Sequence, residues 1–169
     1  MNKNQTIEDV KQWISDFVTK PNPLLNKLPP CPYAKQAMLE DKVQIVVPTQ
    51  GSVSYAIQHA LLNFNHDMDL VMLVFDPQVM DSETFEACVW QWNKTVDPQF
   101  VLLDDHPDNE ENINGVTMNN GKYAIVFIQK SDKLDEASTF LETRTKYYKV
   151  WSQEILDVVV TWRKDRKKS

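Results

Sequence analysis

Cys31 is the residue whose setting in the sequence most favours reactive chemistry. Pro32 follows it, and proline is common at the first position of a helix, so we expect Cys31 at the N-cap of a short helix. Unpaired backbone N–H groups and the positive end of the helix dipole favour a thiolate there, as does Lys35 one turn later. If the thiol is accessible, we expect its pKa to lie below that of a free thiol, which suits a nucleophile or a metal ligand. The alternative is a small buried side chain that anchors the preceding proline-rich segment.

A second candidate lies between residues 104 and 111, where five of eight residues are carboxylates. Carboxylates packed this closely raise one another's pKa or attract a cation, and the imidazole of His106 suits a base or a metal ligand. The predicted metal ligands are Asp104, Asp105, His106 and Asp108. The loop lacks the glycine-fixed ligand spacing of a strong calcium site, so we expect weak binding of a divalent cation at most. The alternative is a solvated acidic loop.

The remaining composition argues against several classes of site. Three glycines in 169 residues leave no glycine-rich loop for a nucleotide phosphate. The net charge is −6, and residues 1–130 carry nine Lys or Arg against seventeen Asp or Glu, so nucleic-acid binding is not expected. The basic cluster at residues 163–168 is typical of a solvated helix end. Cys88 falls on the apolar face of a predicted helix, so we expect it in the core.

The cysteines and the apolar residues also bear on location. The two cysteines are 57 residues apart and do not form a Cys-x-x-Cys pair. No window approaches ~18 uninterrupted apolar residues, so we expect no membrane span. The first residues lack the apolar core of a secretory signal. These features predict a cytoplasmic protein with reduced thiols.

The periodicity of apolar residues predicts the elements that position these side chains. An N-terminal helix precedes a strap with five prolines at residues 20–32, and a helical tail begins at Ser131 and breaks near 143–145. Between them, strands and helices alternate. The predicted strands are 43–47, 70–75, 99–103 and 123–128, and the predicted helices are 32–39, 52–64 and 81–96.

This order predicts one α/β domain with a mixed four-stranded sheet. It comprises an N-terminal helix and proline strap (1–41), an α/β core (42–130) and a long helical tail (131–169). The core order resembles that of thioredoxin-like proteins, although the dithiol of that family is absent and no redox function follows. The alternative is a small doubly wound sheet with a terminal hairpin.

The two strand orders place the candidate residues differently. In a doubly wound sheet the first three strands run parallel, so Gln50, Asp76 and His106 would gather at one edge. In the thioredoxin-like order, which we favour here, the third strand runs the other way. His106 would then lie far from Asp76 unless its loop folds back.

Three short motifs resemble a bacterial family of unknown function. They are Trp13, the Cys-Pro-Tyr-Ala-Lys segment at 31–35, and the His-Pro pair at His106. That family carries Trp, Cys-Pro-Phe-Ala-Lys and Phe-His-Pro in the same order. Here Tyr33 replaces the phenylalanine of the second motif, and Asp105 replaces that of the third. The resemblance implies no activity and only supports the thiol, ammonium and imidazole candidates named above.

Two functions from different classes follow. The favoured one is a non-catalytic interaction protein, whose helical tail docks a protein partner or a second copy, with Tyr147, Tyr148 and Trp151 as a possible contact face. It requires a buried Cys31 and a contiguous apolar patch on the tail. The alternative is a small enzyme, or a redox or metal protein, in which Cys31 and His106 share a cleft. It requires an exposed Cys31 close to an ionisable partner.

Overall fold

Four strands form the central sheet in the order β1, β2, β6, β3. β1 and β2 are parallel, and β6 is antiparallel to both of its neighbours, which confirms the predicted mixed four-stranded sheet. The strands are β1 (Val43–Val46), β2 (Leu70–Phe75), β3 (Phe100–Asp105) and β6 (Ala124–Lys130). This computed structural model describes residues 1–166, apart from the side chains of residues 158, 159 and 166. Lys167 and Lys168 of the basic cluster lie outside the described residues.

The direction of β3 corrects the favoured strand order. β6 lies between β2 and β3 and is antiparallel to both, so β3 runs in the same direction as β1 and β2. The thioredoxin-like order, in which the third strand is reversed, is not confirmed. The strand directions are those of the doubly wound alternative. The carboxyl ends of β1, β2 and β3 therefore lie at the same end of the sheet.

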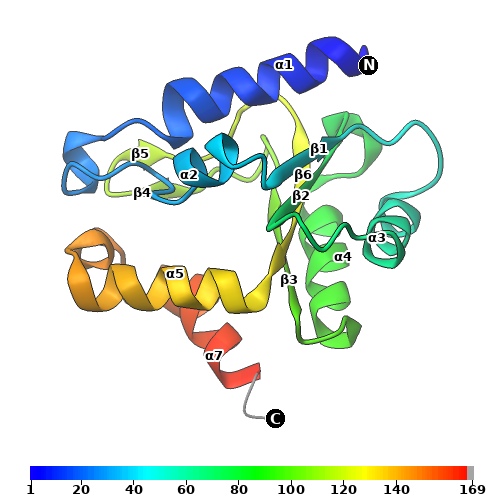
Figure 1. Cartoon of the computed structure of the whole chain (residues 1–169). Coiled ribbons are helices and arrows are strands. Elements are labelled where there is room, and N and C mark those ends of the chain that lie inside the picture. The colour runs from blue at the N-terminus through cyan, green and yellow to red at the C-terminus, as the bar shows by residue number, and fades with distance from the viewer. Residues whose placement is uncertain (167–169) are drawn as a thin grey trace.

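Two helices cover one face of the sheet, α3 (Val53–Leu62) and α4 (Ser82–Thr95) (Figure 1). Alternate residues of a strand point to opposite faces, so one set of side chains from each strand packs beneath these helices. In β6 this set is Ala124, Val126 and Ile128, all fully buried. The face therefore holds the largest apolar cluster of the protein, with Phe85 of α4 near its centre.

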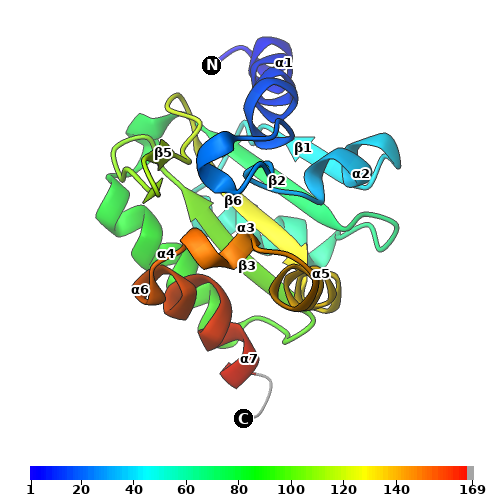
Figure 2. The same cartoon turned by 90° about the vertical axis from the view of Figure 1, so that its left-hand side faces the viewer.

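The opposite face carries the N-terminal part of the chain and α5 (Ser131–Arg144). Helices α1 (Lys3–Trp13) and α2 (Ala34–Leu39) lie in front of the sheet in Figure 2. Val10 and Ile14 pack there against Met72 and Ile125. The helix continues from α1 as a π-helical turn at Ile14–Val18.

The proline strap follows α1 and is packed across the body of the protein. Its 3-10 turn, Pro23–Leu25, inserts Leu25 as a fully buried side chain. Leu25 contacts Ile113 and Val116, which belong to a small hairpin. The hairpin consists of β4 (Asn112–Ile113) and β5 (Val116–Thr117) and lies in the connection between β3 and β6.

The C-terminal tail packs against the body. α5 ends at Arg144, within the segment where a break is expected. The Tyr147 hydroxyl donates to the carbonyl of Pro30, and the ring of Trp162 lies 5.1 Å from that of Trp90 on α4. The tail consists of α5, a 3-10 turn at Tyr147–Val150, α6 (Gln153–Leu156), a π-helical turn at Asp157–Thr161 and α7 (Trp162–Arg166).

Candidate functional site

Cys31 stands at the start of the turn that leads into α2. The helix begins at Ala34, and its N-cap is Tyr33, so the predicted N-cap position of Cys31 is wrong by two residues. The backbone N–H groups of Tyr33 and Ala34 nevertheless act on its sulfur and lower the pKa of the thiol, while the Ala34 N–H donates to the carbonyl of Cys31 at 3.2 Å. Burial, the largest influence, raises the pKa of Cys31 and outweighs the effect of these two N–H groups. The expected depression of the thiol pKa is therefore wrong.

Cys31 is exposed to solvent, although protein atoms crowd the space around its thiol. The charged forms of three phenols, Tyr33, Tyr147 and Tyr148, would each be destabilised by a thiolate at Cys31. Lys35 is exposed on α2 and is not among the groups that act on the thiol pKa.

His106 is a buried structural residue whose side chain is 1% exposed. Its Nε2 lies 3.2 Å from the carbonyl oxygens of Pro77 and Met80, and its Nδ1 accepts the backbone N–H of Asp108 at 3.2 Å. Because Nδ1 accepts a hydrogen bond, the proton of the neutral imidazole is on Nε2. Its ring also packs against Phe85, at 5.6 Å between centroids. Both nitrogens are occupied, so His106 has no free lone pair for a substrate or a metal.

The contacts of His106 follow from the direction of β3. β2 and β3 finish at the same end of the sheet, so His106, which follows β3, reaches the turn that follows β2. In that turn the side chain of Asp76 accepts the backbone N–H of Gln78 at 3.0 Å. Proximity of His106 to this turn was expected for the doubly wound alternative, or for the thioredoxin-like order if the loop after the third strand folds back. The backbone N–H of Cys31 instead donates to the carbonyl of Val18 at 3.0 Å, and no hydrogen bond joins Cys31 to His106 in the described chain.

The predicted metal ligands serve different structural roles. Asp105 accepts hydrogen bonds from the Asn119 side chain at 3.0 Å and from the backbone and side chain of Asn120 at 3.1 and 2.7 Å. Asp104 points to the opposite face of β3, and Asp108 is exposed. Over residues 1–166, no three His, Cys, Asp or Glu side chains form a group suited to a metal ion. The structure therefore does not bring the four predicted ligands together.

Asp104 stands out among these carboxylates because of its pKa. Burial, and then the neighbouring carboxylates of Glu86, Asp105 and Glu111, raise the pKa of Asp104 to about 6. Burial likewise raises the pKa of Asp105 and of Glu111. The acidic segment thus begins with two carboxylates that are buried or half-buried, Asp104 and Asp105, and continues as an exposed loop that carries Asp108, Glu110 and Glu111.

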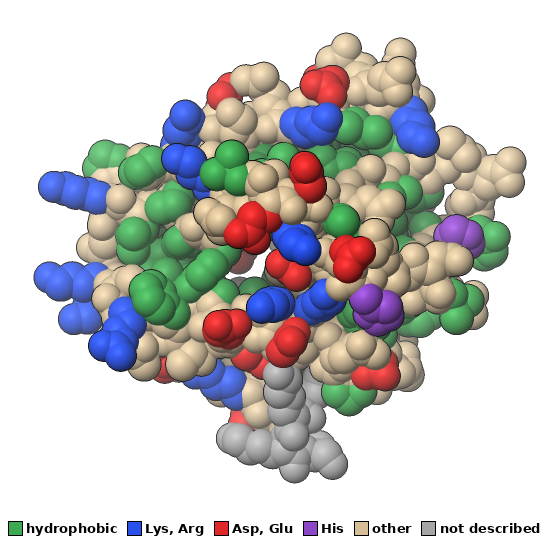
Figure 3. Space-filling view, in the orientation of Figure 1, with side chains coloured by type: hydrophobic (Ala, Val, Ile, Leu, Met, Phe, Trp, Pro, Cys, Tyr) green, Lys and Arg blue, Asp and Glu red, His purple; other side chains and the backbone are tan. Residues whose placement is uncertain are grey.

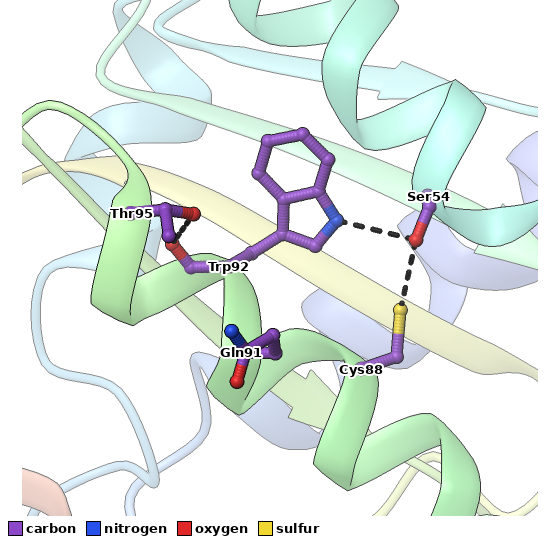
Figure 4. Close-up of a pocket in the computed structure, with 5 residues that line it drawn as sticks. All are labelled: Ser54, Cys88, Gln91, Trp92 and Thr95. Atoms are coloured by element: carbon purple, nitrogen blue, oxygen red, sulfur yellow. Dashed lines mark hydrogen bonds between the residues drawn. The ribbon is translucent and has the colours of Figure 1, made fainter.

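A small hollow lies between α3 and α4, with a volume of about 190 Å³ (Figure 4). The Ser54 hydroxyl accepts a hydrogen bond from Trp92 Nε1 at 3.3 Å and lies 3.3 Å from the Cys88 sulfur. Cys88 also packs against the main apolar cluster, as expected. These contacts join the two helices, and they give Cys88 a structural role.

A larger groove, of about 380 Å³, opens between β1 and α3. The chain leaves β1 at Val46, swings away from the sheet and then forms α3, which lies to the right of the sheet in Figure 1. Apolar side chains of the strands, including Val71 and Leu73, form part of its lining, together with Ala60 of α3. Exposed polar side chains, including Gln44, Gln50 and Tyr55, complete it.

One wall of this groove is an open edge of the sheet. The carbonyl of Lys42 accepts the backbone N–H of Leu70 at 3.2 Å, which fixes the phase of the parallel ladder. Backbone groups alternate in direction along a strand, so the N–H and C=O groups of Val43 and Ile45 point away from β2. Within residues 1–166, these outward groups have no hydrogen-bond partner.

The opposite edge of the sheet is capped at Leu102, in the middle of β3. Asn93 of α4 is 5% exposed, and its side-chain amide donates to the carbonyl of Leu102 at 2.7 Å and accepts the N–H of Leu102 at 2.9 Å. The amide thus replaces a neighbouring strand at β3. Proteins commonly protect edge strands against pairing, so the contrast marks β1 as the edge left available.

The residues of the groove were not predicted from the sequence. The signal that points to them is a run of 24 residues, 43–66, without Asp, Glu, Lys or Arg. This run contains β1 and α3 and supplies eleven of the thirteen side chains that line the groove. In Figure 3 the right-hand flank, over α3, is green, tan and purple rather than red or blue. A surface segment of this length without charge is therefore the feature that distinguishes the site.

Comparison with known proteins does not identify a function for this groove. None of the helices described between residues 1 and 166 has both the length and the apolar character needed to cross a bilayer. Searches against protein-family models, curated proteins and solved structures find no match to this chain.

Proposed function

We propose that this protein is a non-catalytic binding protein that takes up an extended segment of another polypeptide in the groove between β1 and α3. The observation that carries the proposal is the set of unpaired backbone groups of Val43 and Ile45 at the wall of an apolar groove. An extended peptide can add to such an edge as a further strand. Backbone hydrogen bonds then provide affinity, and side chains in the groove provide selectivity.

The tail is not the proposed binding surface. Most of its aromatic side chains already have partners within the protein, because Tyr147 is buried against the strap and Trp162 packs on Trp90, whereas Phe140 is 55% exposed. Tyr147, Tyr148 and Trp151 also pack on one another, with centroids 5.0–5.3 Å apart. The interaction function expected for the tail is therefore assigned to the β1 edge.

The enzyme alternative has less support. The exposed Cys31 meets one of its requirements, but the alternative also needs a base beside an activated thiol, whereas both ring nitrogens of His106 are bonded and the pKa of Cys31 is raised. Cys31 and Cys88 are both free thiols. A cytoplasmic location, where such thiols remain reduced, forms part of this proposal.

Selection of random peptides displayed on phage against the purified full-length protein tests the proposed function. The selected peptides, made synthetically, are titrated into ¹⁵N-labelled protein. We expect amide shifts at residues 43–47 and 53–60. The variant Ile45→Pro removes an outward N–H that does not bond β2, so it should weaken binding at least 10-fold while the sheet remains folded.

Leu62→Ser is the matched control, because Leu62 is exposed on α3 and does not line the groove. Its affinity for the selected peptides should equal that of the wild type. Failure to select any peptide, or shifts confined to residues outside β1 and α3, would overturn the proposal.

A further inference from the structure

We infer that the segment bound at β1 is uncharged and carries apolar side chains at alternate positions. This inference rests on the proposed function and concerns the chemistry of the partner. Residues of an added strand that lie opposite Gln44 and Val46 point to the same face as these two side chains. That is the face on which the groove opens. Two partner side chains, two residues apart, therefore enter the groove.

The lining of the groove determines which side chains can enter. Its apolar part consists of groups such as Val46, Ala60 and Leu73, and its volume of about 380 Å³ accommodates two apolar side chains. Small-ligand sites have comparable volumes, roughly 300–1,000 Å³. Entry of two apolar side chains would remove both their surface and that of the groove from water, which favours binding.

Charge is disfavoured because no carboxylate, ammonium or guanidinium lines the groove, whose single imidazole is that of His59. No Asp, Glu, Lys or Arg occurs from residue 43 to residue 66, and the remaining lining residues are Val71 and Leu73. A charged side chain that enters loses hydration without gaining an ion pair, which is costly. Lys42, the cation next to β1 in the chain, is engaged with the carbonyl of Asp67 at 3.0 Å.

The edge itself lacks the features that protect natural edge strands. Such strands commonly carry lysine, proline or a bulge, which prevents pairing with another chain. The sequence of β1 is Val-Gln-Ile-Val, which contains none of these residues. Its pairing with β2 is also regular through all four residues. A strand of this kind suits a partner of the same character: extended, uncharged and apolar at alternate positions.

Matched peptides test the inference. Three acetylated and amidated peptides share Gly-Ser-Lys ends for solubility and differ only in the core, which is Thr-Val-Thr-Val-Thr, or the same sequence with both Val replaced by Lys or by Glu. Each peptide is titrated into the ¹⁵N-labelled protein to locate its binding site by amide shifts. Its affinity is measured separately by calorimetry. We expect the neutral core to shift the amides of residues 43–47 and to bind at least 10-fold more tightly than either charged core.

Substitution of Gln44 provides the reciprocal test. Gln44→Glu places a carboxylate in the groove with almost no change of shape, so binding of the Lys core should strengthen and binding of the neutral core should weaken. Gln58→Glu is the matched control, since Gln58 is exposed on α3 but does not line the groove. That variant should leave the order of the three peptides unchanged.

The outcomes separate the inference from the proposed function. If the charged cores bind at residues 43–47 as tightly as the neutral core, the inference is wrong while the proposed function stands. If neither these peptides nor any from the random selection perturb β1, the proposed function is wrong as well. Equal effects of Gln44→Glu and Gln58→Glu would also overturn the inference, because selectivity would then not arise in the groove.

Discussion

Gly51 and Tyr55 are in such close contact that position 51 has no room for a side chain. A Cβ atom there would lie 2.5 Å from Cδ1 and 3.0 Å from Cγ of the tyrosine ring. The backbone of Gly51 is also left-handed, with a φ of 83°. Glycine thus allows the β1–α3 connection to hold Tyr55, which is 55% exposed, at the groove.

We expect Gly51→Ala to destabilise the protein and to weaken peptide binding. The left-handed backbone costs about 1 kcal/mol for alanine, and displacement of Tyr55 from its rotamer costs about 1 kcal/mol more. Urea unfolding measures the stability, and titration with the neutral-core peptide measures the binding. Gly121→Ala is the control, because Gly121 has a φ of 72° but no atom within 4 Å of the added Cβ. Equal losses in the two variants would show that the Tyr55 contact is unimportant.

Asn93→Ala should destabilise the protein by about 2–4 kcal/mol. The change leaves the buried N–H and C=O of Leu102 without partners, and each unsatisfied group costs about 1–3 kcal/mol. It also opens a second sheet edge, so we expect concentration-dependent association. Urea unfolding and light scattering measure the two effects. Gln91→Ala, an exposed change on the same helix, should show neither. A loss below about 1 kcal/mol would contradict this account of the β3 edge.

Asp104→Asn should stabilise the protein at neutral pH. The pKa of Asp104 is raised to about 6, so the folded state favours the protonated form. The stability that the folded protein gains from protonated Asp104 is fully present below the unfolded pKa of about 3.8 and is lost as pH rises through about 6. The variant should therefore exceed the wild type by about 1–3 kcal/mol at pH 7.5 and match it near pH 3.5.

Urea unfolding of both proteins across pH 3.5–7.5 measures this dependence. Asp108→Asn removes one exposed negative charge from the same segment and serves as the control. If Asp104→Asn were destabilising at pH 7.5, the carboxylate would have a favourable partner in the folded state, contrary to the repulsion described above.

The thiol of Cys31 should titrate above the pKa of a free thiol. Burial raises this pKa more than the two backbone hydrogen bonds lower it. We expect the rate of alkylation by iodoacetamide, followed by mass spectrometry in the Cys88→Ala background, to reach half its maximum above pH ~8.5. The same protein unfolded in urea gives the reference value. A midpoint below that reference would restore the case for an activated thiol.

Local patterns in the sequence were sufficient to predict the strands and helices but not their arrangement. The composition of the β-branched run predicts β1, and that of the apolar run predicts β2. The position of β6 between β2 and β3 depends instead on pairing across more than 50 residues, from Leu73 to Val126, which no local pattern records. The order of strands, and with it the location of His106, therefore could not be predicted.

The structural role of His106 could not be predicted for a related reason. His106 attracted attention because of its carboxylate neighbours in sequence, whereas two of its hydrogen-bond acceptors are backbone carbonyls of Pro77 and Met80. Backbone partners leave no trace in side-chain composition. The β4–β5 hairpin was detectable, because Asn114-Gly115, with φ angles of 52° and 85°, is a common two-residue hairpin turn.

The contact between the strap and the tail sets the order in which the chain can complete its structure during synthesis. Tyr147 bonds Pro30 and Lys146 bonds Asn26, and these pairs are separated by 117 and 120 residues. The strap therefore emerges from the ribosome long before its partners exist. Its final packing must wait for residues more than 110 positions later in the chain, and contacts of such long sequence separation form slowly. The strap can therefore take its final place only after residues 146 and 147 have left the ribosome.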